Sequence, residues 1–153
     1  MIHSFSRESV QAVSDEAWPL MRRHAEEVSD LGTQSLDPDL EKYRALEAAG
    51  AYAAWTARED GRLFGYSGFL VIASLHYPKI LMALQDVVYI EPERRGPAAV
   101  KFILFVDEEL KAMGVERVIR TVTERKDYSR TLTRMGYTPI ERVFVKQTSG
   151  KEG

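Results

Sequence analysis

The chain has 153 residues, of which 44% are hydrophobic and 29% are charged, and this usage excludes fibrous and intrinsically disordered classes. Its formal net charge of −2 argues against a protein that coats nucleic acid with a basic surface. It contains no cysteine, which excludes disulfides and thiolate catalysis, and with only three histidines no metal site is expected.

Size and hydropathy predict a single domain over residues 1–153, with a polar, flexible tail over 147–153. The N-terminus has no signal-like apolar run, and no stretch approaches the roughly 20 apolar residues that a membrane span needs. These features predict a cytoplasmic protein without a membrane partner.

A short strand over residues 2–5 and two amphipathic helices are expected in the N-terminal part. Between residues 8 and 29, apolar side chains recur every three or four positions, and Pro19 is expected to kink or split this helix. The second helix has Asp37 as its predicted N-cap and ends at Gly50.

An antiparallel meander of three strands is predicted next. Asp60-Gly61 separates two alternating, aromatic-rich runs at 51–59 and 62–75, and such a pair is a strong signal for a β-hairpin. A third run at 80–90 then continues the meander.

The third strand leads through a turn into a helix. The strand should stop near Ile90, because a residue that precedes a proline, here Glu91, favours extended geometry. Gly96 permits a tight turn, and Pro97 suits the first helical position because its missing N–H would be unpaired there. This joint aims free helix amides at the space beyond the strand end, which is a favourable place for a phosphate.

The predicted anion donors are the amides of the first helical turn, and basic side chains add mobile positive charge. The amides are those of Ala98, Ala99, Val100 and Lys101, and the charged side chains are Arg94, Arg95 and Lys101.

After this helix, which Gly114 should end, the pattern predicts a strand, a short helix and a last strand. The strand covers 115–123, the helix 127–135 and the last strand about 140–146. A strand, a helix and a further strand in this order imply a right-handed parallel crossover.

The segment Ile90–Gly96, Ile-Glu-Pro-Glu-Arg-Arg-Gly, resembles motif A of the GNAT family of acyl-CoA-dependent N-acetyltransferases, whose usual form is V-x-P-x-x-R-G-x-G-x-G. Ala98 and Val100 stand where the family usually has glycines. Gly65-Tyr66 and Met135-Gly136-Tyr137 resemble two further signatures of the family, and the predicted element order matches along the chain.

The resemblance implies an α+β, mixed α/β fold: a central mixed, mostly antiparallel twisted sheet of six to seven strands, flanked by about four helices. Within the family, Leu36–Asp39, Leu75–Tyr77 and Pro92–Gly96 resemble a subgroup encoded by tailed phages.

The resemblance also implies transfer of an acetyl group from acetyl-CoA to a primary amine by direct attack, without a metal or a covalent intermediate. The backbone of Val88, Tyr89 and Ile90 would hold the pantetheine arm, and the Val88 amide would face the carbonyl oxygen. The acceptor could be a small molecule or a protein amine, with nucleic acid only as an amino-modified base, and homodimers are frequent in such folds. The alternative is a GNAT-like module that binds acyl-CoA or a protein partner without turnover.

Asp86 and His76 are the candidate general bases that must deprotonate the amine. Asp86 lies in an apolar run, on the same strand face as Val88 and Ile90 by the period of two. A carboxylate on such a face is energetically unfavourable unless it has a hydrogen-bonding partner or a catalytic function. A hydrogen-bonded strand aspartate is the alternative. His76 titrates in the useful range, although an exposed loop histidine would look the same.

Tyr128 is the candidate proton donor to the departing thiolate. The family's usual tyrosine falls at Leu132 here, and Tyr128 lies one turn earlier, where it could equally belong to the core. His24 and Glu27 are neighbours on the first helix and could hold a cationic acceptor, the alternative being a solvated polar face.

Overall fold

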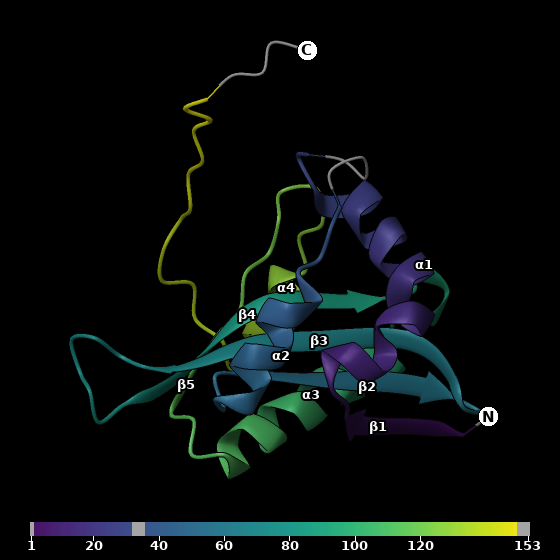
Figure 1. Ribbon diagram of the computed structural model, residues 1–153, viewed down its shortest axis with the longest axis horizontal. Coiled ribbons are helices and arrows are strands. Elements are labelled where there is room, and N and C mark those ends of the chain that lie inside the picture. The colour runs from purple at the N-terminus through teal and green to yellow at the C-terminus, as the bar shows by residue number, and fades with distance from the viewer. Residues whose placement is uncertain (1, 32–35, 150–153) are drawn as a thin grey trace.

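The computed structural model describes residues 2–31 and 36–149. In order along the chain, the elements are β1 (His3–Arg7), α1 (Val10–Val28), α2 (Leu40–Ala48), β2 (Tyr52–Glu59), β3 (Arg62–Ala73), β4 (Leu81–Ile90), the 3-10 helix η1 (Pro92–Arg94), α3 (Pro97–Ala112), β5 (Arg117–Ile119) and α4 (Ser129–Arg134). The strands form one sheet in the order β1-β2-β3-β4-β5 (Figure 1). Strands β1 to β4 are antiparallel and β5 is parallel to β4, which confirms the predicted mixed class.

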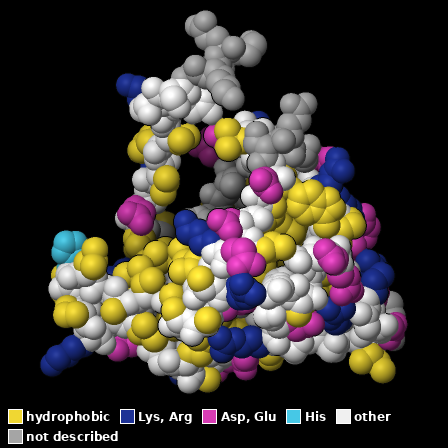
Figure 2. All heavy atoms as spheres, viewed as in Figure 1, with side chains coloured by type: hydrophobic (Ala, Val, Ile, Leu, Met, Phe, Trp, Pro, Cys, Tyr) yellow, Lys and Arg dark blue, Asp and Glu magenta, His cyan; other side chains and the backbone are white. Residues whose placement is uncertain are grey.

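The described sheet has five strands rather than the predicted six to seven, because the C-terminal part differs from its prediction. The strand expected at 115–123 covers only Arg117–Ile119, and the strand expected at 140–146 is absent from the described residues. Val143, Phe144 and Val145 are 81%, 89% and 80% exposed, on a segment that stands away from the body (Figures 1 and 2). An alternating apolar run becomes a strand only where a sheet edge pairs with it, and β5 offers an edge of three residues.

The N-terminal helices differ from prediction in two details. Pro19 lies inside α1 without splitting it, since α1 remains one helix from Val10 to Val28, so the predicted alternative of two helices was wrong. The N-cap of α2 is Asp39, whose side chain accepts a hydrogen bond from the Lys42 amide at 3.0 Å, so the prediction of Asp37 was wrong. Both aspartates suit an N-cap chemically, and the choice depends on where the helix can begin against its neighbours.

The predicted Asp60-Gly61 hairpin is confirmed. The φ angles of Asp60 and Gly61 are 49° and 85°, which matches the left-handed pair of a type I′ turn. The next hairpin, β3–β4, contains a bulge: Gly68 pairs with Val87 and Phe69 with Gln85, so that Asp86 is the extra residue.

Helices pack on both faces of the sheet. Helix α3 contributes Phe102, Val106 and Leu110 to one cluster, and Trp55 and Phe69 belong to the same cluster. Helix α1 contributes Ala17 and Leu20 to a second cluster, which includes Leu63, Tyr66 and Tyr89 from the sheet. The sheet therefore separates α1 from α3, and β4 lies within reach of both. None of the described helices is long and apolar enough to cross a membrane.

Candidate functional site

Strands β4 and β5 pair over three residues and then separate. The ladder joins Met82, Ala83 and Leu84 to Arg117, Val118 and Ile119, and ends there. Beyond it, residues 85–90 meet no strand on their β5 side within the described chain. Within the described chain Gln85 bridges this gap, since its Nε2 donates to the Thr121 carbonyl oxygen at 3.0 Å and its Oε1 lies 3.4 Å from the Tyr128 hydroxyl oxygen. The outer half of β4 thus presents an open backbone edge.

The joint between β4 and α3 has the predicted geometry. Gly96 is the N-cap of α3 with φ 132° and ψ −139°, a conformation essentially reserved for glycine, and Pro97 follows in the first helical position. In the described structure no side chain caps this helix end, and the amides of Ala98 and Ala99 have no acceptor. The Val100 amide, which was also a predicted anion donor, already donates to the Gly96 carbonyl oxygen at 3.1 Å.

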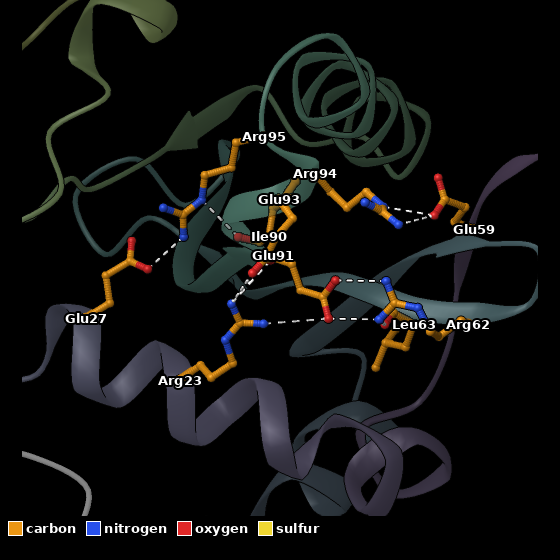
Figure 3. Close-up of polar contacts among 10 residues, drawn as sticks. All are labelled: Arg23, Glu27, Glu59, Arg62, Leu63, Ile90, Glu91, Glu93, Arg94 and Arg95. Atoms are coloured by element: carbon orange, nitrogen blue, oxygen red, sulfur yellow. Dashed lines mark hydrogen bonds and ion pairs between the residues drawn. The ribbon is translucent and has the colours of Figure 1, made fainter. Parts of the chain in front are cut away.

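The two arginines of the turn are held in ion pairs and point to opposite sides (Figure 3). Arg94 Nη2 lies 2.6 Å from Oε2 of Glu59, a side chain only 8% exposed, so the prediction of a mobile Arg94 was wrong. Arg95 Nη2 lies 2.8 Å from Glu27 Oε2, and its Nε donates to the Ile90 carbonyl oxygen at 2.9 Å. Because their partners come from β2 and α1, distant in the sequence, these pairs were not foreseen.

A third carboxylate anchors the turn itself. Glu91 is 7% exposed, and both of its oxygens accept hydrogen bonds from Arg62 at 2.9 Å. Arg23 on α1 joins the same network, because its Nη1 lies 3.8 Å from Glu91 Oε1, and its Nη2 pairs with Glu93 of the turn at 2.9 Å (Figure 3). Charge-assisted bonds to a planar guanidinium have a defined geometry, so this network holds the turn between α1 and β3.

The open edge, the α3 N-terminus and α1 enclose a cavity of about 700 Å³. Most of the predicted site residues line it: His24, Glu27, Asp86, Val88, Tyr89, Ile90, Arg95, Gly96, Ala99, Val100 and Tyr128. Four predicted residues are not among its lining in the described structure: His76, Arg94, Ala98 and Lys101. His76 is exposed in the turn between β3 and β4, and Lys101 is exposed on α3.

Asp86 points to the face of the sheet opposite to the one predicted. Ile90 packs in the cluster on the α3 side, whereas Asp86 accepts hydrogen bonds from Tyr43 of α2 and Tyr52 of β2. The bulge is the physical reason, because one extra residue in β4 interrupts the alternation of side chains. Both phenol oxygens lie close to Oδ2, at 2.8 and 2.7 Å, and neither tyrosine was among the predicted site residues.

The phenols of Tyr43 and Tyr52 act as hydrogen-bond donors throughout the physiological range. Burial, and then the charge of Asp86, raise the pKa of both hydroxyls well above the ordinary value. The two rings also contact each other edge to face, with centroids 4.9 Å apart. The pair therefore fixes the orientation of the Asp86 carboxylate.

Gly68 provides the space that Tyr52 occupies. A Cβ at position 68 would lie 2.0 Å from Tyr52 Oη and 2.8 Å from its Cζ, so Gly68→Ala must displace the ring. We expect this change to lower the free energy of unfolding by about 1–3 kcal/mol, as overpacking of a full core does. Urea denaturation measures the loss. Tyr52→Phe is the control, since it removes the hydroxyl without a clash; an equal loss in both variants would show that crowding is not the cause.

His24 is embedded in an aromatic cluster at the cavity wall. Its Nδ1 lies 3.0 Å from Tyr66 Oη, and its ring stacks on Tyr89 at 5.1 Å between centroids. Burial lowers the pKa of His24 below its ordinary value, so the imidazole is neutral at pH 7. The predicted neighbour Glu27 also lines the cavity, where Arg95 engages it.

Tyr128 faces the gap between β4 and β5. Its hydroxyl oxygen lies 3.4 Å from Gln85 Oε1 and 3.4 Å from the Thr121 carbonyl oxygen. Burial raises the pKa of this hydroxyl, so it carries a proton at neutral pH. Leu132, one turn later on α4, is 7% exposed and belongs to the core.

No protein-family model matches the chain, and no curated protein matches it by sequence. Solved structures do match. A GCN5-related N-acetyltransferase from Ralstonia eutropha JMP134 superposes with a TM-score of 0.74 at 17% identity, covering 97% of this chain and 100% of that one. The chain has the GNAT fold. A predicted acetyltransferase with acetyl-CoA from Clostridium acetobutylicum shares this fold at a TM-score of 0.69 and 11% identity, over 95% and 96% of the two chains.

A third GNAT-fold structure is an aminoglycoside acetyltransferase from an uncultured soil metagenomic sample in complex with sisomicin. It matches at a TM-score of 0.73 and 15% identity, over 97% of each chain. At such identities the likeness establishes the GNAT fold alone. Among the described residues, no cluster of three or more His, Asp or Glu side chains could hold a metal ion.

Proposed function

We propose that this protein is an N-acetyltransferase that moves an acetyl group from acetyl-CoA to a primary amine. The observation that carries the proposal is the meeting of an open β4 edge and uncapped α3 amides at one cavity. An extended amide-containing arm can pair with an open strand edge, and a diphosphate is favoured at a free helix N-terminus.

The residues present fit acetyl-CoA. The amides of Ala98 and Ala99 would hold the diphosphate, and the backbone of Val88, Tyr89 and Ile90 would pair with the pantetheine arm. Arg95 would add positive charge near the diphosphate while it stays paired with Glu27, and Lys101 would add charge at the exposed side of the same helix turn. Bound acetyl-CoA would supply an acetyl group activated as a thioester, with the thiolate of CoA as the leaving group.

Side chains that line the cavity would carry out the proton transfers of the reaction. An alkyl ammonium has a pKa of about 10.4, so Asp86 takes one proton from it to expose the nitrogen lone pair. The Val88 amide donates to the carbonyl oxygen as negative charge develops there. The nitrogen loses its second proton after the new bond forms, and Tyr128 gives a proton to the departing thiolate. One proton is released in total.

Two measurements test the proposal. Acetyl-CoA at 100 times its dissociation constant should stabilise the protein by about 2.7 kcal/mol, seen as a rise in melting temperature. CoA release on adding a panel of primary amines should then report transfer. If acetyl-CoA stabilises the protein but no amine of the panel causes release of CoA, the result would contradict the transferase and support an acyl-CoA-binding module.

A matched pair of variants tests the location of the cofactor site. Ala99 lines the cavity, so Ala99→Asp places a carboxylate against the diphosphate and should abolish the thermal shift. Leu104→Asp puts the same charge on an exposed position of α3 and should preserve it. If acetyl-CoA caused equal thermal shifts in both variants, the diphosphate would have to bind elsewhere.

A further inference from the structure

We infer that the acceptor is a primary amine with one positive charge on an apolar or aromatic body, rather than a polycation. The inference rests on the proposed function, because it concerns the acceptor side of the same cavity. It is carried by the free oxygen of Asp86, by the charges around the cavity and by the apolar wall that α1 provides.

Asp86 offers one oxygen to a ligand. Tyr43 and Tyr52 both donate to Oδ2, and Oδ1 receives no hydrogen bond within the described chain. Asp86 is exposed and lines the cavity, so Oδ1 is open to a ligand. One oriented carboxylate oxygen suits one ammonium group, since a charge-assisted hydrogen bond there is short and directional.

The other charges of the cavity do not suit a polycation. Glu27 is already paired with Arg95 at 2.8 Å and lies 3.9 Å from Lys126 Nζ. Arg95 and Lys126 themselves line the cavity and would repel further positive charge. Asp37 also lines the cavity and is exposed. In the described structure Asp37 and Asp86 are the carboxylates of the lining without an identified basic partner.

Apolar side chains form much of the cavity wall on the α1 side. Helix α1 and the segment before α2 line the cavity with Val13, Ala17, Met21, Ala25, Val28 and Leu36. Tyr66 adds an aromatic surface. Each methylene that an acceptor buries on such a wall should raise its affinity about fourfold, whereas a second ammonium group placed there would lose its hydration without a partner.

The experiment compares three amines with the full chain and acetyl-CoA at pH 7.5. 2-Phenylethylamine carries one charge and an aromatic body, methylamine lacks the body, and spermidine carries several charges. CoA release gives kcat/KM, and ligand-observed NMR on the CoA-saturated protein gives binding without turnover. We expect 2-phenylethylamine to exceed both others at least tenfold in both measurements.

Two variants of α1 sharpen the comparison. Met21→Glu adds a carboxylate to the apolar wall. This variant should reduce or reverse the preference for 2-phenylethylamine over spermidine. Gln11→Glu adds the same charge at an exposed position outside the lining and should keep the wild-type ranking. Thermal unfolding verifies that both variants are folded.

The outcomes separate the two proposals. If 2-phenylethylamine binds preferentially but no amine releases CoA, the proposed transfer is contradicted and only the inferred preference of the cavity for a monocationic amine stands. Equal or better binding of spermidine or methylamine by the wild type overturns the inference while leaving the transferase intact. Absence of binding by all three amines also overturns it.

Discussion

Asp86→Asn is expected to lower kcat for acetyl transfer about 100-fold, the usual contribution of a positioned general base. The asparagine amide oxygen can still accept hydrogen bonds from Tyr43 and Tyr52, which lie 2.8 and 2.7 Å from Oδ2, but it cannot take the ammonium proton. The variant should therefore fold and bind acetyl-CoA as the wild type does. Steady-state rates measured across pH test this expectation. The rate of the Asp86→Asn variant should rise in proportion to the concentration of unprotonated amine at all pH values.

Controls separate proton transfer from orientation. Tyr43→Phe removes one of the two phenols that orient Asp86 and should cost less than tenfold in kcat while preserving the shape of the pH profile. Asp86→Glu keeps a carboxylate and should retain more activity than Asp86→Asn. If Asp86→Asn left both kcat and the pH profile unchanged, the base would have to be water or another group.

Asp107→Ala is expected to lower the free energy of unfolding by about 3 kcal/mol, because it leaves a buried guanidinium without its counter-charge. The Arg120 side chain is 0% exposed, and its Nη2 lies 2.7 Å from Asp107 Oδ1. Its Nε donates to Tyr137 Oη at 3.0 Å, and the Tyr137 hydroxyl donates to Asp107 Oδ1 at 2.8 Å. Urea denaturation measures the loss.

Further variants distinguish the loss of the buried Asp107–Arg120 ion pair from a general effect on stability of an alanine substitution in α3. Glu108 is the exposed neighbour on α3, so Glu108→Ala should change stability by less than about 0.5 kcal/mol. Arg120→Met combined with Asp107→Ala removes both charges and should recover part of the loss, since Met packs against the Phe69 ring that now lies 5.0 Å from the guanidinium. An equal loss for Asp107→Ala and Glu108→Ala would exclude the pair as the cause.

The elements that were predicted correctly are those decided by short-range rules. The hairpin at Asp60-Gly61 follows from residues that tolerate positive φ. The strand, turn and helix from 85 to 110 follow from the prolines and the glycine that separate the strand from the helix. The free amides of Ala98 and Ala99 could be anticipated for the same reason.

Other features depended on which distant segments meet. The bulge at Asp86 arises from the register between β3 and β4, and it turned the carboxylate to Tyr43 and Tyr52 instead of the predicted face. Arg94 is held by Glu59 from another strand, and the apolar run at 140–146 found no edge to pair with. Backbone torsion preferences act between neighbours and can be read along the chain. Register, ion pairing and strand pairing are set by contacts across the sheet, and only the folded arrangement decides them.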